Sequence, residues 1–277
     1  MYYGNLSLAE YERHFFAYPH LHGMTPFRIW GNLYFAGDDS VGIHLIDTGD
    51  GLVVLDTGYP QMQGFTIQSI WALGFRPEQI RLILHTHAHF DHIGATNLLK
   101  TLSGAKTAIS ETDARMMRER PELTMADKSA LFEPDLTIKD GDKIEMGNTS
   151  IRVQNAAGHT AGTLAVFISL TDEKGARKIA GMHGGVGLNT LTLNYTRAHH
   201  LPEARDQFVE SLNRLEDERV DILLGNHTRQ NDTPGKYLRK IERPDDANPF
   251  VDDDAWRRFI QNTRGSFQKM LTRESTE

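Results

Sequence analysis

The sequence predicts an α/β fold in which two β-sheets pack together and helices cover their outer faces. Short runs of β-branched and aromatic residues alternate along the chain with segments of helical period. This alternation occurs in both halves of the chain, which favours two sheets. No Pro-, Gly- or Ser-rich linker divides the 277 residues, so we expect a single domain over residues 1–277.

The first half of the chain is predicted to begin as a meander of strands and to continue with alternating helices and strands. The meander turns at residues 48–51, where Thr, Gly and Asp separate two apolar runs. Apolar residues at helical spacing through residues 62–73 predict an amphipathic helix that Gly74 ends. Around that helix, we expect strands over 27–35, 41–47, 52–56, 82–84 and 106–110, and helices over 93–102 and 111–120.

The second half is predicted to hold four strands and two helices. A polar turn over residues 171–175 joins two of the strands as a hairpin. The last helix places Trp256, Phe259, Ile260 and Phe267 on or near one face, which favours packing against a sheet. We expect strands over 151–156, 163–170, 178–182 and 220–224, and helices over 202–218 and 253–271.

Composition and charge exclude several classes of protein. The chain has no cysteine, which excludes disulfides, thiolate metal sites and a cysteine nucleophile. With 30 Lys and Arg against 37 Asp and Glu, the net charge of −7 disfavours a nucleic-acid-binding face. No apolar run approaches the roughly 18 residues of a membrane span. Residues 1–5 lack the features of a secretory signal, so we expect a cytoplasmic protein, or a periplasmic or secreted one if a signal was removed.

A histidine cluster lies directly between a predicted strand and a predicted helix. It comprises four of the 13 histidines, within residues 85–92. Residues two apart in an extended segment face the same way, so His87 and His89 project together, and the turn into the helix brings Asp91 and His92 beside them. Imidazole nitrogens and a carboxylate oxygen are the ligands that zinc prefers where cysteine is absent. A purely structural role would leave four neighbouring imidazoles without a purpose, so the cluster predicts a metal site.

Two further histidines follow predicted strands. His159 lies in a turn of small residues between two strands, and His227 comes shortly after the strand over 220–224. A single histidine in such a turn is usually structural. Strand ends at one edge of a sheet converge on one crevice, however, so we expect both residues to join the cluster as ligands.

These motifs resemble those of the metallo-β-lactamase superfamily over nearly the whole chain. The matching segments are Asp56-Thr57-Gly58, His87-x-His89-x-Asp91-His92, Gly158-His159-Thr160 and His227. The resemblance implies an αββα sandwich of two mixed β-sheets with helices on the outer faces and a two-zinc site at one edge. It implies that His87, His89 and His159 hold the first zinc, and Asp91, His92 and His227 the second. This ligand set, and residues 248–252, are similar to class B, subclass 3 β-lactamases.

One stretch distinguishes this chain from other branches of the superfamily. Glyoxalase II, lactonases and phosphodiesterases typically place a metal-bridging Asp between the third and last histidine ligands, whereas residues 179–187 here contain no carboxylate. The difference favours the β-lactamase-like branch. Many subclass 3 enzymes carry serines here that hold the substrate carboxylate, and this chain has Gly184 and Gly185. We therefore expect weak affinity for β-lactams, improved by a serine at either glycine.

Several residues near the predicted site have two interpretations. Asp56 either orients a ligand histidine or caps the turn at Thr57-Gly58. His183 is expected to be structural or to face the substrate, because six ligands already suffice for two zinc ions. Tyr195 and Arg229 could reach a substrate carboxylate or amide, although such loop residues are commonly solvated. His85 is expected to pack or to support a ligand, and we interpret His20, His22, His199 and His200 as surface or loop residues, with a place on the rim as the alternative.

The predicted function is that of a dinuclear zinc hydrolase. Zinc lowers the pKa of bound water, so the expected nucleophile is a metal-bound hydroxide oriented by Asp91, with no covalent intermediate. We expect a small-molecule substrate, with β-lactams first and a lactone or another ester as the alternative. A non-catalytic metal-binding protein is a third hypothesis. Neither nucleic acid nor a membrane is an expected partner, and the oligomeric state stays open.

Overall fold

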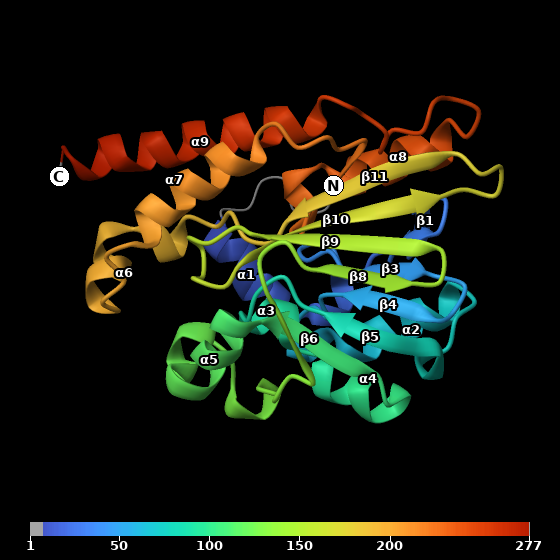
Figure 1. Ribbon diagram of the computed structural model, residues 1–277, viewed down its shortest axis with the longest axis horizontal. Helices are drawn as coiled ribbons and strands as arrows, with labels where there is room; N and C mark the ends of the chain where they lie inside the picture. The colour runs from blue at the N-terminus through green and yellow to red at the C-terminus, as the bar shows by residue number, and fades with distance from the viewer. Residues whose placement is uncertain (1–7, 277) are drawn as a thin grey trace.

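A computed structural model describes residues 8–276 (Figure 1). Residues 1–5, where we expect no secretory signal, lie outside the described residues. Two β-sheets lie face to face with helices on their outer faces, so the predicted fold class is confirmed. The single domain over residues 1–277 stays a prediction.

The first sheet has seven strands in sequence order. Its first four strands are antiparallel, and the pairs from the fourth strand onward are parallel. The parallel pairs need crossover connections, which α2 (Gln63–Ala72), α3 (Phe90–Ile93), α4 (Thr96–Ser103) and α5 (Glu111–Glu119) provide. The strands are β1 (Phe27–Trp30), β2 (Leu33–Phe35), β3 (His44–Asp47), β4 (Leu52–Leu55), β5 (Ile80–Leu84), β6 (Lys106–Ser110) and β7 (Leu136–Ile138).

The second sheet has five strands in the order β12-β11-β10-β9-β8. All its pairs are antiparallel except β11 with β12, which are joined through α6 (Leu193–Ala198) and α7 (Ala204–Leu215). The strands are β8 (Lys143–Met146), β9 (Thr149–Asn155), β10 (Leu164–Thr171), β11 (Arg177–His183) and β12 (Ile222–Leu224). The chain also forms α1 (Leu8–Ala17), α8 (Thr233–Glu242) and α9 (Ala255–Glu274).

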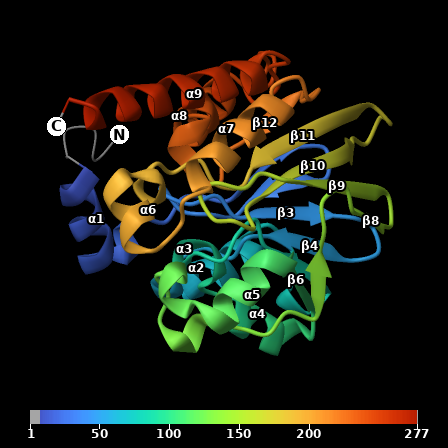
Figure 2. The ribbon, with the colours of Figure 1, turned by 60° about the vertical axis from the view of Figure 1, so that its left-hand side comes forward.

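Apolar side chains fill the space between the sheets and beneath the helices. Ile46 and Val53 of the first sheet belong to the same buried cluster as Val166 and Met182 of the second. On the outer face of the second sheet, α7 and α9 run beside each other (Figure 2), and the Trp256 indole nitrogen donates a 2.7 Å hydrogen bond to the Leu215 carbonyl. Within residues 8–276, no helix combines the length and apolar character needed to cross a membrane.

Some predicted elements have different bounds in the structure. The strand expected over residues 27–35 is a hairpin, because Gly31 has a φ of +51° and turns the chain between β1 and β2. The helix expected over 93–102 is two helices, α3 and α4, separated at Gly94 and Ala95. The sequence analysis missed α1, α6, α8, β7 and β8.

The chain ends of several strands meet at one end of the sandwich. The segment after β5 carries His87 to His92, the turn between β9 and β10 carries His159, and the segment after β12 carries His227. Backbone hydrogen bonds hold these segments together across the sheets. Leu164 donates to the Thr86 carbonyl at 2.8 Å, and Gly42 donates to the Asn226 carbonyl at 2.8 Å. Both sheets therefore contribute residues to the same site.

Candidate metal centre

Three buried histidines from two segments point ring nitrogens at one another. His87 Nε2 lies 3.1 Å from His89 Nδ1, which lies 2.9 Å from His159 Nε2. Burial lowers the pKa of His159 to about 4 and holds the pKa values of His87 and His89 well below the ordinary histidine value. At neutral pH all three imidazoles are uncharged. Their lone pairs are therefore available to a cation.

Asp91 brings the second predicted ligand set together. Its Oδ2 atom lies 3.5 Å from His92 Nε2 and 3.4 Å from His227 Nε2. Burial favours the neutral acid, but His92 and His227 hold the pKa of Asp91 below its ordinary value. His92 Nε2 is buried and has no hydrogen-bond partner among the described residues. A buried nitrogen in this state is costly unless a group absent from the protein itself, such as a metal ion, binds it.

The other ring nitrogens of two ligand candidates are held by hydrogen bonds. His92 Nδ1 lies 2.9 Å from Asp56 Oδ2, and His159 Nδ1 lies 2.8 Å from the Gly187 carbonyl. Donation from each Nδ1 directs the opposite nitrogen, Nε2, toward the centre. Burial opposes protonation of His92, but Asp91 and Asp56 raise its pKa. Of the two interpretations of Asp56, the geometry therefore favours the orientation of a ligand histidine.

Asp113 joins the two segments that carry the first histidine set. Its carboxylate accepts 2.9 Å hydrogen bonds from the backbone nitrogens of Ala88 and Gly162 and from the Thr160 hydroxyl. Ala88 lies between His87 and His89, and Thr160 follows His159. The sequence analysis missed Asp113, because only its burial separates it from the other acids of α5.

Gly184 and Gly185 do not occupy positions from which a serine would face a substrate. A Cβ atom on Gly184 would lie 2.3 Å from the Leu164 carbonyl oxygen and 2.5 Å from Thr86 Cβ, and one on Gly185 would lie 2.7 Å from His159 Cδ2. Neither glycine lines the two cavities beside the histidines. This geometry argues against the expectation that a serine here would improve binding, because backbone atoms and the His159 ring already fill the space.

The remaining histidines of the sequence analysis occupy varied positions. His183 is fully buried, burial lowers its pKa to about 3, and it lines neither cavity, so it has a structural position. His85 Nε2 lies 3.0 Å from the Thr96 hydroxyl. His22 lies in a loop, which is one of the two predicted positions, but its ring is buried rather than at the surface, and its Nδ1 lies 3.0 Å from both Asp39 carboxylate oxygens. His20 is exposed, His199 is half-buried, and His200 is exposed and lines a cavity.

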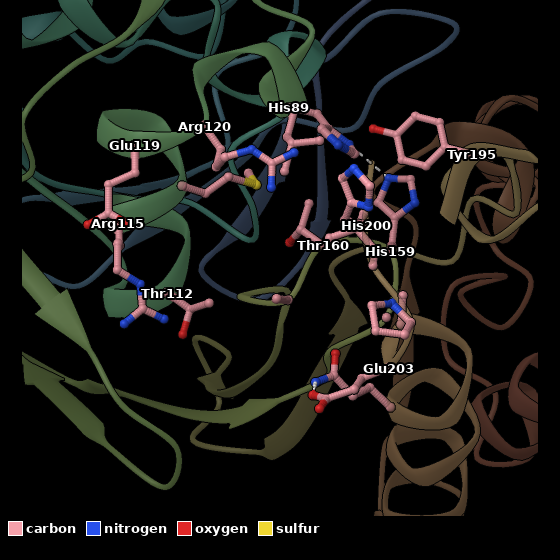
Figure 3. Close-up of a pocket in the computed structure, with 18 residues that line it drawn as sticks. His89, Thr112, Arg115, Glu119, Arg120, His159, Thr160, Tyr195, His200 and Glu203 are labelled. Carbon is pink, nitrogen blue, oxygen red and sulfur yellow. Dashed lines mark hydrogen bonds between the residues drawn. The ribbon is translucent and has the colours of Figure 1, made fainter. Parts of the chain in front are cut away.

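Two cavities share His89 and His159 as lining residues. One, of about 640 Å³, is lined by Asp91, His227 and Arg229, with aromatic walls from Phe16, Tyr59 and Phe90. The other, of about 390 Å³, lies between α5 and the α6–α7 region and includes Arg120, Tyr195 and His200 (Figure 3). Arg229 and Tyr195 thus belong to different cavities.

Comparison with known proteins indicates one family. The model of the metallo-beta-lactamase superfamily matches residues 36–172. The FEZ-1 metallo-beta-lactamase of Legionella gormanii superposes with a TM-score of 0.81 and 28% identity, covering 92% of this chain and 98% of that one. The chain is similar to the metallo-beta-lactamase superfamily over residues 36–172 and has the fold of that superfamily. Its fold is also that of BJP-1, a subclass B3 metallo-beta-lactamase of Bradyrhizobium japonicum, with a TM-score of 0.82 at 24% identity over 92% of this chain and 96% of that one.

Curated relatives within the superfamily match shorter segments. A probable metallo-hydrolase of Burkholderia pseudomallei is 31% identical over 106 residues, which are 37% of this chain and 35% of that protein. A hydroxyacylglutathione hydrolase of Maricaulis maris is 29% identical over 124 residues, 45% of this chain and 37% of that protein. The chain therefore spans little more than a third of the length of these two relatives.

Proposed function

We propose that this protein is a zinc-dependent hydrolase that opens cyclic amides, with β-lactams as the leading substrates. The observation that carries the proposal is the convergence of six donor groups at the shared end of both sheets, with His92 Nε2 buried and without a partner among the described residues. The similarity to FEZ-1, which is named a metallo-beta-lactamase, supports the substrate class.

The donor set fits zinc. The ligand atoms of His87, His89 and His159 lie within 4.8 Å of one another, as do those of His87, Asp91 and His92. Imidazole nitrogens with a single carboxylate suit a borderline cation such as zinc better than magnesium or calcium, which prefer oxygen. We assign His87, His89 and His159 to one zinc ion, and Asp91, His92 and His227 to a second.

The protein groups around the centre divide the work of hydrolysis. Bound zinc supplies Lewis acidity, which activates water and polarises a carbonyl group. Asp91 is ionised, because neighbouring histidines lower its pKa, and it lines the larger cavity. Its carboxylate can orient the attacking water there and accept a proton from it. Asp56 and the Gly187 carbonyl keep the rings of His92 and His159 in fixed orientations. Arg229, which lines the same cavity as Asp91, is positioned to bind a substrate carboxylate.

An ester or thioester substrate is the second candidate. The match to a hydroxyacylglutathione hydrolase favours it. The same six donors serve this reaction, because both reactions are the attack of water on an acyl carbon.

Metal analysis combined with a substrate panel tests the proposal. The purified protein is expected to contain about two zinc ions per chain and to hydrolyse a chromogenic cephalosporin faster than a lactone, a thioester or a phosphodiester. His92→Ala should lose about one zinc ion, and the exposed His20→Ala should retain both. Undiminished zinc in His92→Ala would remove the second site, and zinc-loaded protein that cleaves only the lactone or thioester would make the second candidate the function.

A further inference from the structure

The smaller cavity borders the first histidine set but not the second. It is lined by His89 and His159, whereas Asp91 and His227 line only the larger cavity. A substrate with its scissile carbonyl at the centre therefore has two directions in which to extend. We take the groups on the leaving nitrogen to extend toward Asp91, His227 and Arg229, which line the larger cavity. The arm on the acyl carbon then extends into the smaller cavity.

Charged and polar side chains line this smaller cavity. Its charged residues are Arg115, Glu119, Arg120 and Glu203, and of these only Arg120 is half-buried while the others are exposed. In Figure 3 the Arg120 guanidinium extends toward His89 and Tyr195, and that of Arg115 lies beside Thr112. Arg120 is therefore the charge best placed to meet a group bound next to the histidines.

Two hydrogen bonds hold the Arg120 guanidinium in place. Its Nε donates to Glu122 Oε1 at 2.7 Å and its Nη2 to the His199 carbonyl at 3.2 Å. Nη1 makes no hydrogen bond to the described residues, so the N–H groups of Nη1 are available to a ligand. Burial raises the pKa of Tyr195, which keeps its hydroxyl protonated as a second donor at this cavity.

We propose that the smaller cavity is an acyl-side subsite that selects substrates whose acyl arm carries a carboxylate, with Arg120 as the specificity-determining residue and Tyr195 as a supporting donor. The inference rests on the proposed function, since it takes the acyl carbon to lie at the histidines. A carboxylate gains a charge-assisted hydrogen bond from an already ordered guanidinium, so little side-chain entropy is lost on binding.

Three penicillins that differ only on the acyl arm test the proposal with zinc-loaded protein. These are benzylpenicillin, its α-carboxy derivative and its α-amino derivative. We expect the α-carboxy compound to have a KM about tenfold below that of benzylpenicillin, with kcat unchanged within about twofold, because a remote contact binds ground and transition states alike. Arg120→Gln should remove the difference, and Arg120→Glu should favour the α-amino compound.

Arg118→Gln is the matched control, because Arg118 lies in the last turn of α5, two residues before Arg120, pairs with Glu133 at 3.1 Å and does not line the cavity. The preference should survive in this variant. Absence of a preference in the parent, or an equal loss in Arg118→Gln, would overturn the proposal. A uniform fall for all three penicillins in Arg120→Gln would show that Arg120 acts only as a structural link between α5 and α6.

A binding measurement separates this inference from the hydrolase proposal. Calorimetric titration of zinc-loaded parent and Arg120→Gln with phenylmalonate and phenylacetate reports the arm preference without turnover. Both acids can contact the metal through a carboxylate. The readout is therefore the ratio of the Kd of phenylacetate to the Kd of phenylmalonate, compared between parent and variant. A phenylmalonate preference that Arg120→Gln abolishes would support the subsite even if no penicillin is cleaved, and an unchanged ratio would refute it.

Discussion

Asp91 is the one carboxylate among the six proposed ligands, so its charge can be removed without changing its shape. We predict that Asp91→Asn lowers kcat at least 100-fold, which corresponds to about 3 kcal/mol of lost transition-state stabilisation. The free energy of unfolding in zinc-free buffer should change by less than about 1 kcal/mol, because the substitution is isosteric. Steady-state kinetics and urea titration measure the two quantities. Turnover within twofold of the parent would contradict the role of Asp91.

Gly184 provides a second prediction at the scale of single residues. A side chain there would meet the Leu164 carbonyl and Thr86, so Gly184→Ser should lower the free energy of unfolding by about 1–3 kcal/mol and should not lower KM. Gly64→Ser is the control, because nothing lies within 4 Å of a Cβ atom at Gly64. Urea titration of both variants compares them. Equal free energies of unfolding for Gly184→Ser and Gly64→Ser would show that the contacts around Gly184 leave room for a side chain.

The sequence predicts some residue roles and conceals others. The spacing of His87, His89, Asp91 and His92 places them together in any strand-to-helix connection, so local geometry alone predicts this part of the site. The positions of Gly184 and Asp113 depend on partners far along the chain, Leu164 and Thr86 for one and Ala88 and Gly162 for the other. No local pattern encodes such contacts.

At the scale of elements, α5 acts on the centre through Asp113. We predict that Asp113→Ala lowers zinc affinity at least tenfold, because the 87–89 segment and the turn after His159 lose their common hydrogen-bond acceptor. Glu119→Ala, an exposed change on the same helix, is the control. Competition with a zinc-chelating dye measures the affinity. Equal affinities in the two variants would show that the segments keep their positions without Asp113.

Buried strands such as β6 and the amphipathic helices α2 and α9 were predicted well, whereas the edge strands β7 and β8 were not. The predicted and observed bounds of β6 agree, because its last four residues are buried and apolar or β-branched for the most part. β8 alternates exposed and half-buried residues at the edge of its sheet, so its sequence resembles a loop. Between α3 and α4, a tertiary contact requires a glycine at Gly94, since a Cβ there would lie 2.2 Å from the Pro60 backbone nitrogen.

At the scale of the whole molecule, buried histidines outside the centre make stability depend on pH. Burial lowers the pKa of His44 to about 4. His44 of the unfolded chain binds a proton near pH 6.5, whereas His44 of the folded chain stays neutral until the pH approaches 4. The contribution of neutral His44 to the free energy of unfolding is therefore complete above pH 6.5 and is lost as the pH falls toward 4. The slope is about 1.4 kcal/mol per pH unit.

Comparison of the parent with His44→Gln isolates this contribution. Urea titrations between pH 7 and 4 in zinc-free buffer should show a shallower loss of stability in the variant, while His20→Gln, at an exposed position, should follow the parent. Asp38 acts in the opposite direction in both proteins, because burial raises its pKa to about 7 and its contribution is lost as the pH rises. Parallel curves for parent and His44→Gln would contradict the assignment.

The division of the ligand segments between two sheets affects how fast a metal ion can leave. Each proposed set draws on both sheets: His87 and His89 meet His159, and Asp91 and His92 meet His227. Release of an ion from either proposed set would therefore break contacts between segments that follow strands of different sheets. We therefore expect the half-life for exchange of bound zinc with free isotopic zinc to depend on the contacts between the two sheets. Metal retention would then be a kinetic property of the whole sandwich.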